Sequence, residues 1–374
     1  MRNNTTIFDI FQTLLKKEEV ITVCAVLGYK DTSRKFTVYD LFQFFIATAT
    51  NEYKSFRAGS DFMNEAGLRA VDYSTISKKA ANVDYKIAKK LFEILITKCN
   101  RSTRRILKLP KDLLAVDSTT ITVGEGRLKW AKFKGNKSGI KLHVALNVNT
   151  LMPQKVIETT ANKHDGPIGE KLINTDCILV EDRAYGKHKR YDMFKSIKQA
   201  FVIRIKDNIT LSYPKNIKSL RTENSNIIKD VTCYLGEGSS KTENRFRVVQ
   251  FSDFYGKSIR VCTNLMAITP EKIADIYKER WKVESFFRFI KQNLNVKRLF
   301  GTSENAVYNQ LFIALIAYVL LHFSYVNVSQ NLKFVKLSFC EFVRKLLNST
   351  LQDEVQVCID LLFKNINNYQ ICLW

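Results

Sequence analysis

The sequence of 374 residues has few of the features that mark secreted, disulfide-rich or zinc-binding proteins. Its eight cysteines include no CxxC pair, and with only four histidines no zinc site can be assembled from local spacing. The chain is also too long for a small disulfide scaffold, so we expect reduced thiols that lie mostly in the core. These absences favour a cytosolic globular protein, and we do not expect histidine to bind a metal.

Long hydrophobic runs are also scarce. The N-terminus, MRNNTTIFDIF, lacks the apolar stretch of a signal peptide. The most hydrophobic segment, LFIALIAYVLL at residues 311–321, is too short as a continuous apolar run to span a bilayer. We therefore expect a buried core helix at this position, and no membrane partner.

Acidic residues are outnumbered by basic ones, with 36 Asp and Glu against 59 Lys and Arg. The formal net charge of +23 is spread along the whole chain rather than held in a tail. A folded protein with this excess most simply binds a polyanion, and nucleic acid is the first candidate. The alternative is a basic protein without such a partner.

No glycine or proline follows Pro270 in the segment TPEKIADIYKERWKVESFFRFIKQNL, residues 269–294. Thr269 is a good N-cap and proline suits the first helical position, so the pattern predicts one long helix. Four polar side chains share an arc of about 60° on it: Tyr277, Arg280, Glu284 and Lys291. Arg280 and Glu284 are either an i,i+4 pair on a solvated face or part of a functional site.

The first 105 residues are mostly helical by pattern. Thr37 to Asp40 resembles a capping box, with Asp in place of the usual Glu. A helix, a glycine-containing turn and a short helix follow, and we expect the polar residues of the short helix to be exposed: Ser74, Thr75, Lys78 and Lys79. This arrangement resembles a helix-turn-helix and predicts DNA contacts from Lys78 and Lys79. A simple helical hairpin is the alternative.

A strand pattern begins after Pro110. We expect a three-strand meander over residues 113–122, 139–147 and 154–160, a helix at 167–174, and a buried strand at 177–180. A basic helix at 187–198 and a strand at 200–205 come next, and residues 206–262 form a β-rich insertion. Helices over 307–325, 334–346 and 351–366 complete the chain.

Three acids stand at notable places in this order. Asp117 ends the first strand, Asp182 ends the fourth, and Glu284 lies on the long helix. If the first and fourth strands are neighbours in a mixed sheet, the two aspartates converge and the helix can bring Glu284 to them. Three carboxylates within about 4–6 Å need a cation, and oxygen ligands suit two Mg²⁺ or Mn²⁺ ions performing phosphoryl transfer. Alternatively, Asp117 forms an Asx-turn and Asp182 pairs with a neighbouring cation.

Three segments carry a family resemblance: AVDSTTI, LVEDRAYGKHKRYDMF followed by FVIRIKDN, and the spacing Y-x2-R-x3-E-x6-K in the long helix. They resemble the DDE transposases of bacterial insertion sequences, in the branch named for insertion sequence four. The resemblance covers roughly residues 110–325. The second motif reads DRAY where DRGY is usual, a small change at Ala184.

The resemblance implies an α/β fold with a ribonuclease-H-like mixed sheet, and together with the patterns above it gives the following expected organisation. Residues 1–105 would be a helical DNA-binding domain, and residues 106–300 a catalytic domain interrupted by the β-rich insertion at about 206–262. Residues 301–374 would be a helical region for dimerisation. The protein would act as a synaptic homodimer on double-stranded DNA, in the bacterial cytoplasm at the nucleoid.

The resemblance also implies roles for individual residues. Asp117, Asp182 and Glu284 would be the catalytic, metal-binding triad, while DNA phosphates would be held by Tyr277, Arg280 and Lys291. Family members cut and paste DNA through a hairpin intermediate, which some stabilise by stacking a base on a tryptophan of the insertion. This insertion contains no tryptophan, and its candidates for stacking are Tyr234, Phe254 and Tyr255.

Two other functions remain as alternatives. One is a ribonuclease-H-like nuclease or resolvase that cuts DNA without joining it. The other is a catalytically silent regulator that only binds DNA, although the presence of all three acids favours an active enzyme.

Overall fold

The computed structural model describes residues 6–51, 53–106, 112–135, 137–217, 225–332 and 336–369. These residues form two compact units, which we describe separately. The first contains residues 1–106, 121–138 and 287–374, and the second contains residues 107–120 and 139–286. The N-terminal and C-terminal helical regions, which the sequence analysis treated as separate domains, thus belong to the same unit.

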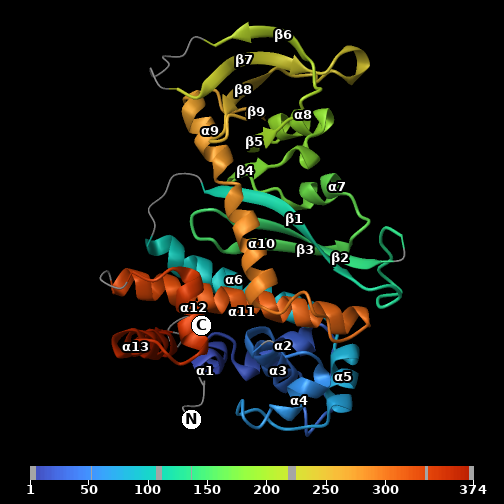
Figure 1. The fold of residues 1–374 in the computed structure, drawn as a ribbon, viewed down its shortest axis with the longest axis vertical. Helices are drawn as coiled ribbons and strands as arrows, with labels where there is room; N and C mark the ends of the chain where they lie inside the picture. The colour runs from blue at the N-terminus through green and yellow to red at the C-terminus, as the bar shows by residue number, and fades with distance from the viewer. Residues whose placement is uncertain are drawn as a thin grey trace. The chain divides into compact units, whose positions relative to one another are not determined.

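A nine-stranded mixed sheet dominates the second unit, in the order β3-β2-β1-β4-β5-β9-β8-β7-β6 (Figure 1). Its strands are β1 (Leu113–Val123), β2 (Ser138–Asn147), β3 (Pro153–Thr160), β4 (Ile178–Glu181), β5 (Ala200–Arg204), β6 (Leu211–Asn216), β7 (Ile227–Leu235), β8 (Phe246–Ser252) and β9 (Ser258–Thr263). β4 is parallel to both β1 and β5, and β2 is antiparallel to β3. The mixed α/β, ribonuclease-H-like architecture expected from the sequence is confirmed.

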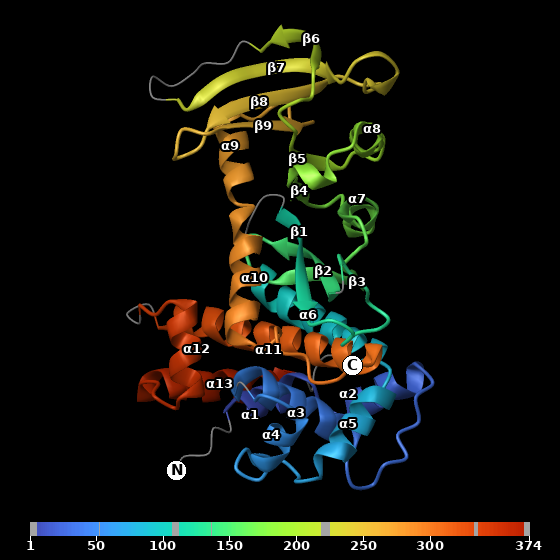
Figure 2. The same ribbon diagram turned by 45° about the vertical axis from the view of Figure 1, so that its right-hand side comes forward.

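The β-rich segment continues this sheet. β9 pairs antiparallel with β5, and β8, β7 and β6 follow it outward (Figure 2). The sequence analysis described residues 206–262 as an insertion between the last core strand and the long helix. β6 to β9 do lie between β5 and α9 in the chain, and the register of Ile203 with Cys262 shows that they extend the core sheet.

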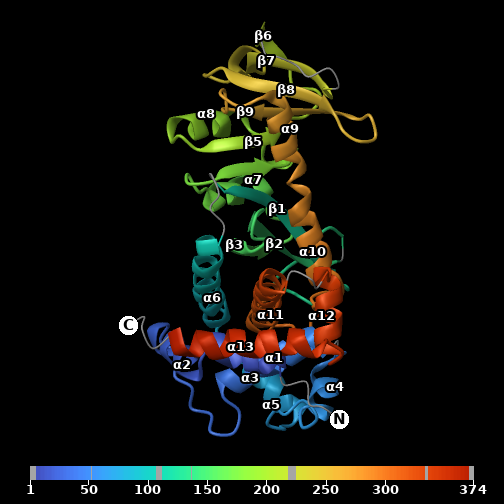
Figure 3. The same ribbon diagram turned by 90° about the vertical axis from the view of Figure 1, so that its left-hand side faces the viewer.

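Helices cover both faces of the sheet. The connections carry α7 (Asp165–Gly169), the 3₁₀ turns η1 (Glu170–Leu172), η2 (Arg183–Tyr185) and η3 (Gly238–Ser240), and α8 (His188–Ser196). On one face, Tyr191 and Phe194 of α8 pack against Phe201 and Phe246. On the other face, Ile273 and other apolar residues of α9 (Pro270–Lys278) pack against β4, β5, β7 and β8. Figure 3 shows α8 and α9 on opposite sides of β5.

The first unit is helical. Its elements are α1 (Thr6–Leu14), α2 (Lys17–Val26), α3 (Val38–Asn51), α4 (Phe56–Asp61), α5 (Tyr73–Asn82), α6 (Lys86–Ile106), α11 (Glu304–Asn331), α12 (Phe339–Leu347) and α13 (Asp353–Tyr369). α10 (Trp281–Asn293) begins in the second unit and ends in the first. The expected capping box at α3 is confirmed, because the backbone N–H of Thr37 donates to Asp40 at 2.7 Å and the Asp40 N–H donates to Thr37 Oγ1 at 3.3 Å.

α11 is the central helix of this unit and packs against α1, α3, α5, α6, α12 and α13. It is long and apolar enough to cross a membrane, but 83% of its most apolar window is buried inside the protein. The expectation of a buried core helix is therefore confirmed. Tertiary packing on several sides accounts for a helix that is apolar around its circumference.

The described cysteines are free, and five of them are buried: Cys24, Cys99, Cys177, Cys233 and Cys262. Cys340 is exposed and Cys358 is half-buried. The expectation that the thiols lie mostly in the core is confirmed for this part of the chain. Cys372 and Trp374 lie outside the described residues.

Candidate active site

Two aspartates lie where the parallel pairing of β1 with β4 ends. The register pairs Val116 of β1 with Glu181 of β4, and Asp117 and Asp182 are the next residues in the chain. Asp182 follows β4, but β1 continues to Val123, so Asp117 lies within β1 and the expectation that it ends the first strand is wrong. Because residues in register on neighbouring parallel strands lie side by side, both carboxyl groups are presented together where the β1–β4 pairing ends. The prediction that the first and fourth strands are neighbours in the sheet is confirmed.

The segment that brings Glu284 to this edge is broken into two helices. α9 ends at Lys278 and α10 starts at Trp281, and the N–H groups of Arg280 and Val283 bond to carbonyls only three residues back. The prediction of one uninterrupted helix is wrong. No glycine or proline marks the break, which coincides with the burial of Arg280 against two carboxylates. The predicted N-cap is correct, since Thr269 Oγ1 accepts from the N–H of Lys272 at 3.3 Å.

Arg280 connects the acids of the site. Its Nη2 donates to Glu284 Oε1 at 2.6 Å, and its Nη1 donates to Asp117 Oδ2 at 3.4 Å. The Tyr277 hydroxyl donates to Asp182 Oδ1 at 3.5 Å, a long contact. Only 9% of the Arg280 side chain is exposed, so the interpretation as a solvated surface pair is wrong. The second unit therefore brings together five of the six residues that the sequence singled out around the triad.

The electrostatics show how strongly these acids depend on a nearby cation. Burial, with smaller contributions from the negative charges of Glu284 and Asp182, raises the pKa of Asp117 to about 6. The Ser118 N–H and Arg280 act in the opposite direction. Burial alone would lower the pKa of Arg280, but its anionic partners raise it overall. The carboxylates thus repel one another, and in this structure the compensating positive charge is the guanidinium.

The donor chemistry of the site fits a hard divalent cation. Asp117, Asp182 and Glu284 offer carboxylate oxygens, which Mg²⁺ and Mn²⁺ prefer. In the described residues, however, no three His, Cys, Asp or Glu side chains are arranged to hold a metal ion. Arg280 contacts two of the three acids, and its Nε is buried without a hydrogen-bond partner among the described residues. A metal ion would therefore require Arg280 to move away from Asp117.

A polar network beside Asp117 was missed by sequence reasoning. Asp165 Oδ1 accepts from Ser118 Oγ at 2.9 Å and from Lys141 Nζ at 3.1 Å, and lies 3.5 Å from His143 Nδ1. Ser118 in turn donates its N–H to Asp117 Oδ1 at 2.8 Å. Burial lowers the pKa of His143 to about 4, so this histidine is neutral at pH 7. The short His-Asp motif at residues 164–165 was the signal that could have revealed the network.

A buried ion pair supports the corner that carries Asp182. Arg190 of α8 donates to both oxygens of Glu181, at 2.5 and 2.8 Å, and also to the Tyr185 carbonyl at 2.9 Å. The Glu181 side chain is fully buried, and burial raises its pKa against the opposing effect of Arg190. The pair links β4, which precedes Asp182 in the chain, to α8, which follows it. The sequence signal that could have predicted this ion pair was a lone glutamate in an apolar strand, followed nine residues later by an arginine.

The remaining candidate residues lie in the first unit. Lys291 is half-buried on α10, where burial and the charge of Lys297 lower its pKa. Lys78 is exposed on α5 as expected. Lys79 is not, because its side chain is 8% exposed and its Nζ lies 2.5 Å from Asp31 Oδ1 and 3.1 Å from Ser33 Oγ. The expectation that Lys79 is exposed is wrong. Its ammonium group instead pairs with Asp31, 48 residues earlier in the sequence.

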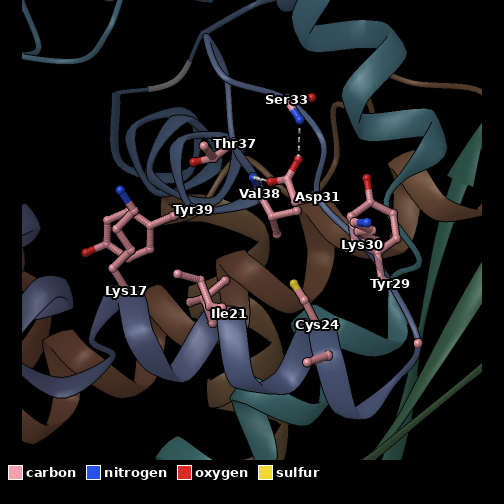
Figure 4. Close-up of a pocket in the computed structure, with 13 residues that line it drawn as sticks. Lys17, Ile21, Cys24, Tyr29, Lys30, Asp31, Ser33, Thr37, Val38 and Tyr39 are labelled. Atoms are coloured by element: carbon pink, nitrogen blue, oxygen red, sulfur yellow. Dashed lines mark hydrogen bonds between the residues drawn. The ribbon is translucent and has the colours of Figure 1, made fainter.

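Asp31 also organises a cavity of about 530 Å³ between α2 and the segment before α3 (Figure 4). Its carboxylate accepts the N–H groups of Val38 at 2.6 Å and Ser33 at 3.1 Å, as the close-up shows. No residue predicted for the site lines this cavity. The Asp31 carboxylate thus serves as a structural ion-pair partner for Lys79 within the first unit.

The fold and these side chains define a class of protein. A ribonuclease-H-like sheet with acids just beyond the paired part of two adjacent parallel strands, and a third acid from a following helix, is typical of enzymes that cut and join phosphodiester bonds.

Comparison with known proteins gives the family. A family model described as "Transposase DDE domain" matches residues 108–320. The chain is 48% identical over 351 residues to a probable transposase for insertion sequence element IS5377 of Geobacillus stearothermophilus, covering 94% of this chain and 93% of the relative. The chain belongs to the DDE transposase family. It is therefore an enzyme that acts on DNA by the metal-dependent chemistry of that family.

More distant relatives agree. The putative transposase y4zB of Sinorhizobium fredii is 33% identical over 234 residues, with 62% of this chain and 65% of the relative covered. A putative transposase for insertion sequence element IS4SA of Synechocystis is 27% identical over 263 residues, covering 67% of this chain and 71% of the relative. A solved structure of the piggyBac transposase synaptic complex with hairpin DNA has a TM-score of 0.48 and 14% identity, over 96% of this chain and 85% of that one. The family model and the relatives from insertion sequence elements confirm the resemblance to insertion-sequence transposases.

Proposed function

We propose that the protein performs cut-and-paste transposition of an insertion sequence. It would cleave DNA at terminal inverted repeats, form hairpin ends and transfer the strands into a target. The observation that best supports this proposal is the meeting of Asp117, Asp182 and Glu284 around Arg280 and Tyr277. In that cluster, carboxylate oxygens that would bind metal ions lie beside a guanidinium that would bind phosphate.

In this proposal Asp117, Asp182 and Glu284 hold two Mg²⁺ ions, with Mn²⁺ as a substitute. Such ions would activate the nucleophile and stabilise the leaving oxygen of an in-line displacement. Asp117 must be ionised to bind a metal ion. Burial raises its pKa to about 6, which sets the pH above which the ionised form predominates. Ser118 orients the carboxylate through its N–H.

Tyr277, Arg280 and Lys291 would hold the terminal phosphates of the transposon end. A guanidinium is suited to this task because its planar N–H groups match phosphate oxygens. On DNA binding, Arg280 would exchange its 3.4 Å contact with Asp117 for a phosphate oxygen, which would free that carboxylate to hold a metal ion. Lys291, seven positions after Glu284 on α10, would supply a further positive charge.

The domain roles complete the proposal. Residues 1–105 would contact DNA, with exposed Lys78 on α5 as a contact residue; residues 106–300 would perform the chemistry. Residues 301–374 would form the synaptic homodimer. Val357 and Leu361, one turn apart on α13, are 54% and 53% exposed, which supports a contact there. The enzyme would work in the bacterial cytoplasm at the nucleoid, where its substrate lies.

Two aromatic residues support the hairpin step. Phe254 and Tyr255 occupy the turn between β8 and β9 and are 95% and 89% exposed. Aromatic side chains exposed in this way can stack on an unpaired base. We propose that they replace the tryptophan used by some family members.

The decisive experiment incubates the purified protein with a labelled DNA fragment that carries the sequence flanking its gene, with and without Mg²⁺. Asp117→Asn is tested in parallel, with Asp176→Asn, an exposed aspartate before β4, as the matched control. We expect a Mg²⁺-dependent nick or hairpin at the repeat boundary for the wild type and the control only. Cuts at DNA junctions but not at the ends would indicate a resolvase, and binding without cleavage would indicate a regulator.

A further inference from the structure

The outer strand β6 contains a tyrosine in an unfavourable backbone conformation. Tyr213 has φ +51°, precedes Pro214 and is 70% exposed, and the β6–β7 register shifts between Ser212 and Lys215. Bulky residues avoid the left-handed region, and residues before proline favour extended backbone. Such strain persists only where the surroundings hold it, often at functional positions. Here Arg245 donates to the Tyr213 carbonyl at 2.7 Å.

Two cations gather over the tyrosine rings. Tyr213 and Tyr234 are edge-on with centroids 6.5 Å apart, and Lys241 Nζ lies 5.4 and 5.1 Å from the two centroids. Arg245 Cζ lies 5.1 Å from the Tyr234 centroid. Lys241 is exposed and forms no ion pair with any described residue, including the two glutamates of its own loop. Its charge is therefore open to an outside anion.

The loop that carries Lys241 is held in place by α8. Asp192 accepts the backbone N–H groups of Glu243 at 3.0 Å and Asn244 at 2.9 Å. The loop begins at Gly236, with φ +83°, where an added Cβ would lie 2.6 Å from the His188 ring. A cation on such a fixed loop loses little freedom when it binds a ligand.

We propose that Tyr213, Tyr234, Lys241 and Arg245, the tyrosine–cation cluster, bind the sugar–phosphate backbone of duplex DNA. Lys241 pairs with a phosphate, Arg245 holds the strained bulge and adds charge, and the exposed Tyr213 ring packs on an adjacent sugar. The net charge of +23 favours a polyanion as the occupant. Contacts of this kind position DNA without reading its sequence. The inference rests on the DNA-acting function proposed above and assigns a contact surface separate from the acids.

The test compares variants of the full-length protein by fluorescence anisotropy in EDTA, using a labelled duplex with the element's end and one of unrelated sequence. We expect Lys241→Ala to raise Kd by at least about threefold on both duplexes and to lower the log–log salt slope by about 0.9. Lys241→Arg should bind like the wild type. Lys171→Ala, an exposed lysine of η1 in the same unit, is the matched control and should leave affinity unchanged.

Tyr213→Gly separates the DNA contact from a structural role. Glycine adopts positive φ without strain, so the thermal unfolding temperature should not fall, while DNA binding weakens. Wild-type affinity and salt slope in Lys241→Ala, on both duplexes, would overturn the inference. If the wild type still cleaves the DNA ends of its own element in that case, the proposed function stands. A wild type that neither binds nor cleaves the ends overturns the proposed function itself.

Discussion

Arg280 is the residue on which the charge balance of the site depends. Its guanidinium contacts Glu284 at 2.6 Å and Asp117 at 3.4 Å while its side chain is nearly buried. Removing a single acid from such a cluster changes metal binding more than folding, because the guanidinium keeps its other acidic partner. The acids and the cation therefore have separable effects on cleavage and on DNA binding.

Glu284→Gln should reduce metal-dependent cleavage at least about 10³-fold, because the amide is a poor ligand for a hard cation. Binding of the end duplex should stay within about threefold of the wild type, since phosphate contacts are made by other residues. Glu279→Gln is the matched control, as Glu279 pairs only locally with Lys282. Wild-type cleavage by the Glu284 variant would disprove the triad assignment.

His322 makes the stability of the first unit depend on pH. It packs against Tyr318 and Phe339 in the core, and burial lowers its pKa from 6.5 to about 4. The unfolded chain therefore binds more protons between these values, so the stabilisation is complete above about pH 6.5 and is lost as the pH falls toward 4. The shift corresponds to about 3 kcal/mol.

His322→Phe should remove this dependence while preserving the aromatic packing. Between pH 7 and pH 4 the wild type should lose about 3 kcal/mol more unfolding free energy than the variant. Urea unfolding at several pH values measures the difference. His143, whose pKa burial also lowers to about 4, remains in both proteins and serves as an internal reference. Parallel stability curves for the two proteins would contradict the prediction.

At the level of elements, one buried arginine ties the outer strands to the start of α9. Arg247 on β8 binds Asp230 on β7 at 2.8 and 2.7 Å and also donates to the carbonyls of Leu265, Met266 and Ile268. Both charged side chains are at most 2% exposed. This pair fixes the segment between β9 and α9, which leads to the α9–α10 junction and Arg280.

Asp230→Asn should destabilise the second unit by about 3 kcal/mol, because it leaves a buried guanidinium without its counter-charge. Thermal and urea unfolding measure the loss. Asp207→Asn, an exposed turn position, should change stability by less than about 0.5 kcal/mol. An equally small effect at Asp230 would mean that the carbonyl contacts alone hold Arg247.

Lys291 allows a test of the DNA contact proposed for α10. Lys291→Ala should weaken binding of the end duplex and lower the log–log salt slope by about 0.9, as expected for the loss of one phosphate contact. Lys345→Ala on α12, whose lysine pairs with Glu341 at 3.2 Å, is the control. A salt slope equal to that of the wild type would exclude Lys291 from phosphate binding.

For the whole molecule, the excess of 23 positive charges predicts strong non-specific affinity for DNA. If about 6–10 phosphates are contacted, affinity for an unrelated duplex should fall about 10³-fold or more between about 50 and 200 mM salt. Anisotropy titrations at several salt concentrations measure this slope, with Asp117→Asn expected to share it. A flat salt dependence would show that the charge is not used for DNA.

Local sequence patterns determined much of this protein. Periodicity identified the strands that carry Asp117 and Asp182, and capping chemistry located Thr37 and Thr269 at helix starts. The apolar run at 311–321 identified the buried helix α11. These features depend on neighbours within a few residues, where side-chain direction and backbone hydrogen bonding follow directly from residue type.

Only the tertiary structure decided the rest. The break before Trp281, the burial of Lys79 against Asp31, and the pairing of β9 with β5 all arise between residues far apart in the sequence. Their partners are chosen by burial and by the need to compensate charge away from water, which no local pattern records. The residues of the site, Arg280 included, could be named from the sequence, but the contact of its guanidinium with Asp117, 163 residues away, could not.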